Sequence, residues 1–237
     1  LIGVPRADLI ETYTAALRLL CCERAMVVSG AEGLDEISIS GPTHIATIGF
    51  DLPNDVITPE DAGLPRHPAE AIKGGDAAYN AAALRRLLVG EGGAYRDAVL
   101  LNAGAALVVA GHASTISEGV EEAAILIRPE TPADHVAIHD VTQRAFAPMP
   151  YSDGDEQLLI GKLRDAGALA LSLVAESDGV VVGQITFSPA FAADGSPGWY
   201  ALGPVSVEPV LKHQSIGSQL IHAGIACLQD QDAAGCI

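Results

Sequence analysis

The order of apolar and polar residues divides the chain into helical and extended segments. Apolar positions recur at helical spacing in Pro5–Leu20 and in residues 76–89, 95–110, 116–124 and 155–166. Short apolar runs predict strands at residues 24–28, 43–50, 169–177, 180–187 and 199–207. Asp178-Gly179, between two of these runs, is typical of a two-residue hairpin turn. The pattern therefore predicts an α/β protein.

Composition narrows the class of protein. The chain has 237 residues, of which 49% are hydrophobic, enough for a packed core in one or two domains. Its net charge of -17 is spread over both halves, with 8 Lys and Arg against 17 Asp and Glu up to Ala124, and 5 against 13 after it. Because neither half is basic, we expect no nucleic-acid partner.

Cysteine usage and the absence of long apolar runs indicate the compartment. Cys21, Cys22, Cys227 and Cys236 form no C-x-x-C pair, which favours reduced thiols in the core. The first ten residues do not resemble a signal peptide, and no apolar run reaches the ~18 residues of a membrane span. We therefore expect a cytoplasmic protein with no membrane association.

The stretch Lys212–Gln219, KHQSIGSQ, follows the strand predicted at residues 199–207 and begins a segment with helical spacing. At such a helix start the free backbone N–H groups point outward and attract anions. Ser215, Gly217 and Ser218 are small enough to let a pyrophosphate reach these groups. The alternative is a helix N-terminus that Ser215 simply caps.

From Ile125 onward the chain resembles the GNAT superfamily of acetyl-CoA-dependent N-acetyltransferases. ILIRPETPADHVAIHDVTQRAF is similar to the first strand and helix of that domain, with Asp134 in the first turn of the helix. The loop departs from the family signature at two positions. Lys212 replaces Gln or Arg, and Ser215 replaces the first Gly. Serine at that position costs little unless the backbone requires a positive φ.

This resemblance implies a site for acetyl-CoA. The backbone of Val205, Ser206 and Val207 would pair with pantetheine. The loop would hold the pyrophosphate through residues Lys212, His213, Gln214, Ser215, Ile216, Gly217 and Ser218. Glu208 could relay a proton from a primary amine, the acetyl acceptor, through water. The alternative for Glu208 is a solvated carboxylate before Pro209.

Adjacent acidic residues, Asp35 and Glu36, lie on a glycine-containing loop in SGAEGLDEISISGP. Two carboxylates at a strand end can hold Mg2+ while a phosphate substrate completes the coordination. The alternative is a solvated acidic turn.

The same loop belongs to a second resemblance, which covers nearly all of Leu1–Ala124. The blocks GVPRADLIETYTAALRLL, VVSGAEGLDEIS, ITPEDAGLPRHP, GGDAAYNAAALRRLLVGEGGAYRDAVLLNAGAALVVAG and SEGVEEA are similar to the C-terminal portion of anthranilate phosphoribosyltransferase. This implies a tryptophan-biosynthesis activity that joins anthranilate to phosphoribosyl pyrophosphate. It also implies that Asp35 and Glu36 bind Mg2+. Ser29 stands where that family usually has His.

Together the two resemblances predict a chimeric transferase. Residues 1–124 would form a partial α/β domain of the phosphoribosyltransferase, and residues 125–237 a partial GNAT mixed sheet with flanking helices, truncated near its fifth strand. The former family's helical region, Gly-rich loop and Lys-His-Gly-Asn motif are not found among the 237 residues. The alternative is therefore an inactive truncated or frame-fused product that at most binds CoA or a protein partner. A sheet cut at its fifth strand would leave residues 199–207 unpaired, which predicts self-association.

Overall fold

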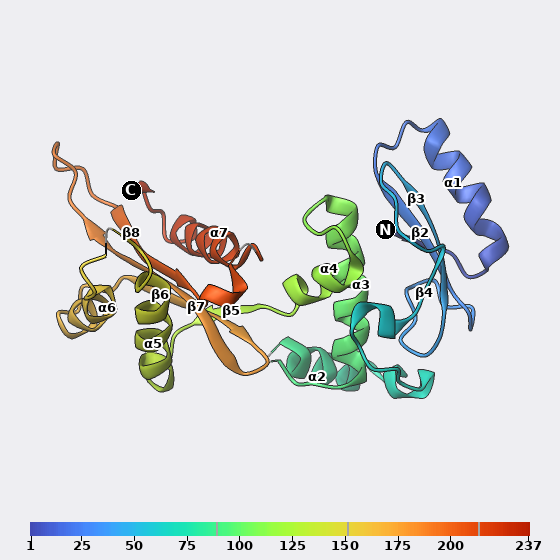
Figure 1. Cartoon of the computed structure of the whole chain (residues 1–237), viewed down its shortest axis with the longest axis horizontal. Coiled ribbons are helices and arrows are strands. Elements are labelled where there is room, and N and C mark those ends of the chain that lie inside the picture. Colours follow the sequence, from blue (N-terminus) through green and yellow to red (C-terminus); the bar gives the residue numbers. More distant parts are fainter. Residues whose placement is uncertain (89, 151, 213) are drawn as a thin grey trace. The chain divides into compact units, whose positions relative to one another are not determined.

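The computed structural model describes residues 1–88, 90–150, 152–212 and 214–237. The chain forms two compact units, Leu1–Ala124 and Ile125–Ile237 (Figure 1). Each unit is a mixed α/β structure with its own sheet and core, as the sequence predicts. The units are described separately below.

Within residues 1–88 and 90–124, the first unit contains four strands and four α-helices. Its strands are β1 (Ile2–Gly3), β2 (Ala25–Gly30), β3 (Thr43–Ile48) and β4 (Val56–Ile57). Its helices are α1 (Ile10–Leu19), α2 (Ala77–Leu88), α3 (Ala94–Ala110) and α4 (Ile116–Ala123), with short 3-10 helices at Ala7–Leu9, Pro59–Ala62 and Ala69–Ile72. The strand order is β1-β2-β3-β4, with β1 and β2 parallel and the other pairs antiparallel.

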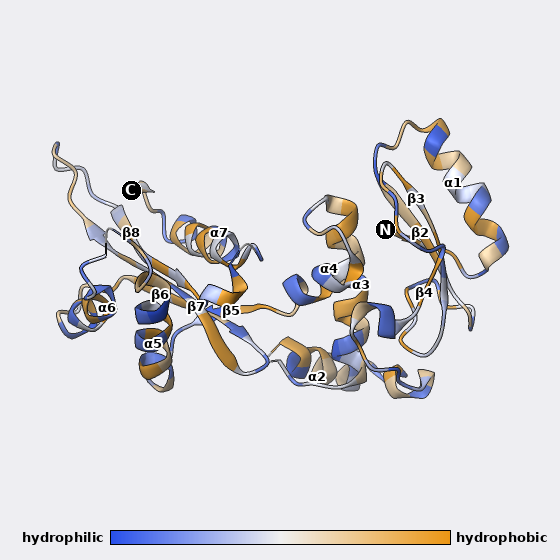
Figure 2. Cartoon of the chain, viewed as in Figure 1, coloured by the Kyte–Doolittle hydropathy of each residue, from blue (hydrophilic) through white to orange (hydrophobic). Residues whose placement is uncertain are grey.

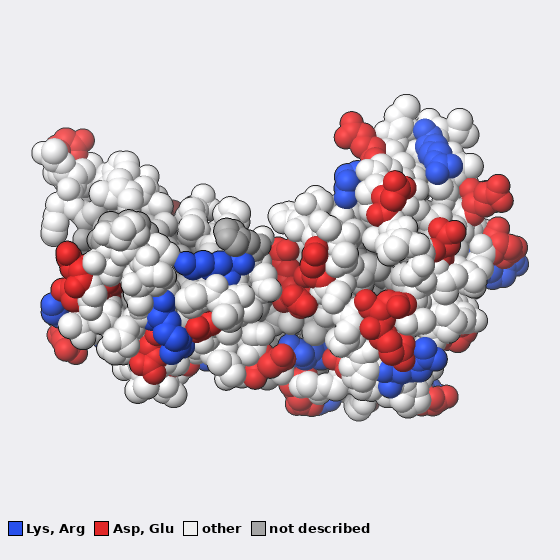
Figure 3. Space-filling view, viewed as in Figure 1, with Lys and Arg blue, Asp and Glu red and all other residues white. Residues whose placement is uncertain are grey.

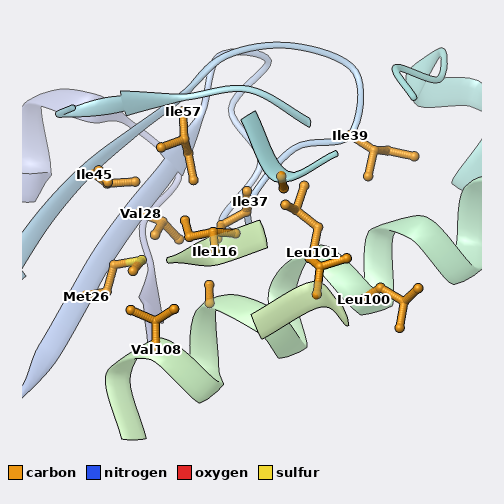
Figure 4. Packing of buried hydrophobic residues seen from close by; sticks show 13 residues of the cluster. Met26, Val28, Ile37, Ile39, Ile45, Ile57, Leu100, Leu101, Val108 and Ile116 are labelled. Atoms are coloured by element: carbon orange, nitrogen blue, oxygen red, sulfur yellow. The ribbon is translucent and has the colours of Figure 1, made fainter. Parts of the chain in front are cut away.

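The sheet of the first unit lies between two helical layers. All six residues of β2 are buried, as expected for a strand covered on both faces. Val27 packs with Val4 and Ile10 beside α1. Met26 and Val28 point the other way, into the cluster built with α3 and α4 that Figure 4 shows. Figure 2 shows that α3 and the strands of this unit carry many hydrophobic residues, and residues of both contribute to the cluster.

Helices α3 and α4 cross at two glycines, Gly104 and Gly119. A Cβ atom added to Gly104 would lie 2.6 Å from the backbone nitrogen of Val120, and one added to Gly119 would overlap the carbonyl oxygen of Gly104. The two backbones are therefore in direct contact, and no side chain fits between them. Thr115 and Glu118 form a capping box that fixes where α4 begins.

In the part of residues 125–237 that the structure describes, the second unit has a five-stranded sheet and three α-helices. The strands are β5 (Leu126–Pro129), β6 (Leu171–Ser177), β7 (Val180–Ala190), β8 (Trp199–Val207) and β9 (Gly235–Cys236). The helices are α5 (His135–Phe146), α6 (Glu156–Asp165) and α7 (Ile216–Gln229), with 3-10 helices at Pro132–Asp134 and Pro209–Leu211. The strands follow one another in sequence order across the sheet, antiparallel except for β8 and β9.

The sheet of the second unit is also covered on both faces. Val174 and Val181 pack against Ile138 of α5 and Ile160 of α6. On the opposite face, a larger cluster joins the sheet to α7 through Leu173, Ala175, Ile185, Phe187, Ile216, Leu220 and Leu228. Asp178 and Gly179 both have positive φ in the β6–β7 turn, which confirms the predicted hairpin.

Strand β8 has a free edge that is shorter than predicted. Trp199 and Tyr200 pair with β9, and the N–H of Leu202 donates to the carbonyl oxygen of Ile237. The prediction that the whole of residues 199–207 is unpaired is therefore wrong at its N-terminal end. Only residues 203–207 lack pairing with a described strand on the side away from β7.

Several other sequence predictions concern surfaces. All four cysteines are free thiols, as predicted. Cys22, Cys227 and Cys236 are half-buried, and Cys236 packs against the core of the second unit. The prediction of a core position is wrong for Cys21, which is exposed. No helix within the described ranges is long and apolar enough to cross a membrane. On the face shown in Figure 3, Lys and Arg occur in small groups among acidic side chains on both units.

Candidate functional site

The first candidate site is the turn that leads from β8 into α7. A 3-10 helix follows β8, and Ser215 then adopts φ 58° and ψ 1°, the left-handed conformation, directly before α7. The φ of Ser215 is thus of the kind that favours glycine, which is the residue expected there from the sequence resemblance. His213 lies outside the described residues.

The N-terminus of α7 is uncapped among the described residues. Ser215 occupies the N-cap position, but its side chain makes no capping hydrogen bond, so the alternative in which Ser215 caps the helix is wrong. The first helical bond runs from the N–H of Gln219 to the carbonyl oxygen of Ser215, 2.9 Å. The N–H groups of Ile216, Gly217 and Ser218 precede that bond and have no acceptor in the described part of the chain.

The turn brings the start of α7 against the end of β8. A Cβ atom on Gly217 would lie 3.8 Å from Cγ2 of Val207. Val205 and Val207 pack toward the α7 side of the sheet. Ser206 faces the other way and is 2% exposed. The free edge of β8 and the uncapped amides of α7 are therefore neighbours, whereas the hydroxyl of Ser206 is buried elsewhere.

Glu208, the predicted proton relay, is held by an ion pair. Arg144 of α5 donates from Nε to both carboxylate oxygens at 3.1 Å and from Nη2 to Oε2 at 2.9 Å. The Glu208 side chain is 21% exposed, so it is not the solvated carboxylate of the alternative interpretation. The hydrogen bond to Glu208 raises the pKa of Arg144, which keeps the guanidinium charged.

A buried polar cluster beneath this site was not predicted from the sequence. Gln184 and Thr186 of β7, Ser206 of β8 and Thr142 of α5 are all between 0% and 2% exposed. Gln184 Nε2 donates to Ser206 Oγ at 3.0 Å and to the carbonyl oxygen of Pro204 at 3.2 Å. The sequence signal was available, because Gln184 interrupts the apolar run VVVGQITF of a strand buried on both faces.

The second candidate site is the acidic pair of the first unit. Asp35 and Glu36 lie in the loop after β2, and the backbone of Asp35 rests on Gly3 of β1. Burial and the neighbouring Asp35 carboxylate raise the pKa of Glu36. The N-terminal ammonium of Leu1 offsets only part of this rise, so the loop could accept a divalent cation. In the described ranges, no group of three or more His, Cys, Asp or Glu side chains could hold a metal by itself.

Comparison with protein families assigns both units. Residues 1–129 match the glycosyl transferase family, a/b domain, and residues 135–236 match the acetyltransferase (GNAT) family. The first match spans more than half of the chain, so the chain belongs to the glycosyl transferase family, and it carries a GNAT domain after that segment. Both resemblances inferred from the sequence are confirmed at this level.

Individual relatives agree with this assignment. The chain is 51% identical over 125 residues to anthranilate phosphoribosyltransferase of Sphingopyxis alaskensis, covering 52% of this chain and 38% of the relative. It is 50% identical over 125 residues to the enzyme of the same name from Parvibaculum lavamentivorans, covering 52% and 37%. The chain thus spans about two fifths of the length of these curated relatives.

Two solved structures are also similar to parts of the chain. A GNAT family acetyltransferase from Brucella melitensis in complex with acetyl-CoA is 47% identical, with a TM-score of 0.46, over 47% of this chain and 73% of that one. Anthranilate phosphoribosyltransferase from Thermus thermophilus is 40% identical, with a TM-score of 0.46, over 50% of this chain and 35% of that one.

Proposed function

We propose that the second unit binds acetyl-CoA and transfers its acetyl group to a primary amine. The observation that carries this proposal is the left-handed turn at Ser215, which leaves the amides of Ile216, Gly217 and Ser218 without acceptors beside the free edge of β8. Uncapped amides at the positive end of a 14-residue helix form a favourable site for phosphate oxygens.

The residues present fit this cofactor in several respects. The amides of residues 216–218 would hold the pyrophosphate, together with the exposed side chain of Lys212 as a point charge. Gln214, also exposed, lies in the same turn. The free edge of β8 at residues 205–207 would bind pantetheine through backbone groups. Acetyl-CoA would supply the acetyl group as a thioester.

Glu208 is the proposed proton acceptor for the amine. It follows β8 directly and is mostly buried, which places a carboxylate at the end of the proposed donor site. The ion pair with Arg144 fixes the orientation of the Glu208 carboxylate, which would accept the proton. Arg144 is therefore proposed as a positioning residue.

Calorimetric titration of acetyl-CoA tests the binding site. Gly217→Val should obstruct the approach of the pyrophosphate at any salt concentration, because it adds bulk next to Val207. Lys212→Ala should weaken binding mainly at low salt, because it removes one exposed charge. Gly161→Val is the matched control, since an added Cβ at that helical glycine has no neighbour within 4 Å. Equal heats in all four proteins would contradict the proposal.

Catalysis is tested separately with Glu208→Gln. The amide keeps the shape of the side chain but cannot accept the proton, so we expect acetyl transfer to fall roughly 100-fold. The affinity for acetyl-CoA should stay the same. Release of the CoA thiol, measured with each of a panel of primary amines, would give both the activity and the acceptor preference. Unchanged rates would remove Glu208 from the mechanism.

For the first unit we propose weak Mg2+ binding by Asp35 and Glu36 and a role in phosphoribosyl transfer to anthranilate. The raised pKa of Glu36 and the 51% identity to an anthranilate phosphoribosyltransferase support it. Two carboxylates leave Mg2+ mostly hydrated until substrate oxygens of phosphoribosyl pyrophosphate join them.

We expect the 237-residue polypeptide to form no phosphoribosyl anthranilate by itself. It spans about two fifths of the relatives, and the groups that clamp a pyrophosphate leaving group provide most of such catalysis. An assay with Mg2+ and both substrates checks this expectation. Turnover above background would contradict it.

The non-catalytic alternative is a chain that binds CoA or a protein partner without turnover. It predicts acetyl-CoA binding that responds to Gly217→Val but no acetyl transfer to any amine. The coding DNA on both sides of this sequence provides an independent check. Upstream phosphoribosyltransferase motifs and downstream acetyltransferase motifs would favour the enzyme.

A further inference from the structure

Strand β8 contains a bulge just before the proposed donor edge. Ile185 of β7 pairs with Val205, whereas Phe187 pairs with Leu202. Gly203 and Pro204 therefore lie together opposite the single residue Thr186. In a bulge the regular ladder is interrupted, so the carbonyl groups there need other partners if they are buried.

Two side chains of β7 satisfy those carbonyl groups. Thr186 Oγ1 donates to the carbonyl oxygen of Gly203 at 2.7 Å. Gln184 Nε2 donates to the carbonyl oxygen of Pro204 at 3.2 Å. Both side chains are completely buried. The path of β8 through the bulge is thus held by side chains of its neighbour strand.

The hydrogen bonds of Gln184 continue in one direction to α5. Thr142 donates its only hydroxyl hydrogen to the carbonyl oxygen of Ile138 at 2.8 Å. The hydroxyl of Ser206, 3.0 Å from Thr142 Oγ1, must then be the donor of that pair. Ser206 in turn accepts from Gln184 Nε2. The amide of Gln184 is therefore the first donor of a chain that ties β7 and β8 to α5.

The oxygen of the same amide lacks a hydrogen-bond partner in the part of the chain that the structure describes. Gln184 Oε1 is buried without a hydrogen bond among the described residues. An apolar side chain of similar size would avoid the free-energy cost of burying an oxygen without a hydrogen bond. Core packing alone would therefore favour an apolar residue at position 184. The hydrogen bonds that the Gln184 N–H groups donate explain why a glutamine is present.

We propose that Gln184 is a positioning residue for the acetyl donor. It contacts both sides of Val205, through the carbonyl of Pro204 and the hydroxyl of Ser206, and so fixes the backbone that the donor's pantetheine would meet. This inference rests on the proposed function of the second unit. It predicts that Gln184 contributes to binding of the pantetheine half of acetyl-CoA. Binding of the nucleotide half, which the α7 turn would hold, should not depend on Gln184.

The test compares Gln184→Met with the wild type. Methionine fills the same space without a donor, so the dissociation constant for acetyl-CoA should rise about tenfold, as expected for loss of one or two hydrogen bonds. Affinity for adenosine 3′,5′-bisphosphate, measured by competition or direct calorimetry, should change less than about twofold. Ser206→Ala should give a smaller loss in the same direction.

Ser172→Ala is the matched control. Ser172 is a buried hydroxyl in β6 that donates to Glu130 at 2.6 Å, away from β8. Its loss should lower the unfolding temperature without changing affinity for acetyl-CoA. If Gln184→Met does not fold, Ser206→Ala and Thr186→Val carry the same comparison.

The outcomes separate the two proposals. Wild-type protein that binds no acetyl-CoA would overturn the proposed function and this inference with it. Normal wild-type binding with unchanged affinity in Gln184→Met would overturn the inference alone. The inference would also be overturned if Gln184→Met lost affinity equally for acetyl-CoA and for adenosine 3′,5′-bisphosphate, or if Ser172→Ala lost as much affinity for acetyl-CoA. Either result would show that Gln184 acts only through stability.

Discussion

The carbonyl group of Asp35 rests directly on Gly3, so closely that a Cβ atom at Gly3 would overlap its oxygen. Gly3 belongs to β1, which pairs with β2 through Gly3 and Val28. The short strand β1 thus supports the loop that carries the acidic pair Asp35 and Glu36. The position of the candidate metal ligands depends on a residue 32 positions earlier that has no side chain.

Gly3→Ala should displace the Asp35–Glu36 loop. The new methyl group meets backbone, which cannot rotate away as a side chain would, so we expect the first unit to lose about 1–3 kcal/mol of unfolding free energy. The Mg2+ affinity that we propose for Asp35 and Glu36 should fall as well. Thermal unfolding and a calorimetric Mg2+ titration measure the two effects.

Gly41→Ala is the control for that substitution. It lies in the same unit, but an added Cβ has no heavy atom within 4 Å. Stability and Mg2+ affinity should stay close to those of the wild type. If Gly3→Ala behaved like Gly41→Ala, the support of the loop by β1 would be disproved.

Ser215→Gly should stabilise the second unit. The left-handed conformation of Ser215 costs roughly 1–2 kcal/mol for a residue with a Cβ atom, partly offset by the greater freedom of glycine in the unfolded chain. A net gain of about 0.5–1 kcal/mol is expected. Acetyl-CoA affinity should be maintained or improved, since the turn is unchanged.

Ser218→Gly provides the comparison, because Ser218 lies in the first turn of α7, where glycine costs about 0.5–1 kcal/mol. Opposite signs of the stability change at the two serines would confirm the strain at Ser215. Destabilisation at both positions would contradict it. Urea unfolding gives both values, with fluorescence of Trp199, the only tryptophan, reporting on the second unit.

Asp134 should make the second unit sensitive to acid. The guanidinium of Arg128, at 2.8 and 2.9 Å, and the N–H and O–H of Thr131 hold the pKa of Asp134 well below its usual range. A folded pKa below the unfolded value stabilises the protein above the unfolded pKa, about 3.9. That stabilisation is lost as the pH falls through the folded pKa.

Asp134→Asn should therefore cost about 1.5–3 kcal/mol at pH 7, and less as the pH is lowered. Asp153→Asn, at an exposed position in the same unit, should change little at any pH. Urea unfolding at pH 7, 5 and 3 gives the comparison. A loss in Asp134→Asn that did not shrink with acidification would refute the assignment.

The free edge of β8 predicts weak self-association that acetyl-CoA suppresses. Among the described residues of β8, only 203–207 lack a strand partner on this side, and Pro204 has no N–H to donate. The edge is therefore a poorer template for a second chain than the whole strand would be. If the donor uses the same backbone groups, ligand and second chain compete. Light scattering over a concentration series, with and without acetyl-CoA, would show this competition. A monodisperse monomer at high concentration would count against it.

Much of the fold could be predicted from apolar spacing. The predicted helix at residues 155–166 is Glu156–Asp165 in the structure, and the predicted strand at residues 199–207 is Trp199–Val207. Strands β1 and β4 have two residues each, too few for any periodicity to indicate them. They form because the longer neighbouring strands offer backbone hydrogen-bond partners. That pairing depends on tertiary structure and not on local sequence.

The candidate sites were only partly visible in the sequence. The small residues near Ser215 indicated the turn, but its left-handed conformation depends on the path from Pro209–Leu211 into α7. The pair Arg144–Glu208 spans 64 positions, so no local pattern could indicate it. Gln184 could have been noticed as a polar residue in an apolar strand, but its partners could not.

The contact between Gly104 and Gly119 also restricts how the first unit can evolve. At most crowded positions, enlargement of one side chain can be offset by a smaller neighbour. Here each glycine meets the backbone of the other helix, so a smaller side chain at Val120, which also touches Gly104, would not remove the overlap. A larger residue at either position could therefore not be offset by a second substitution. Sequence divergence of this helix pair must occur at residues around the crossing.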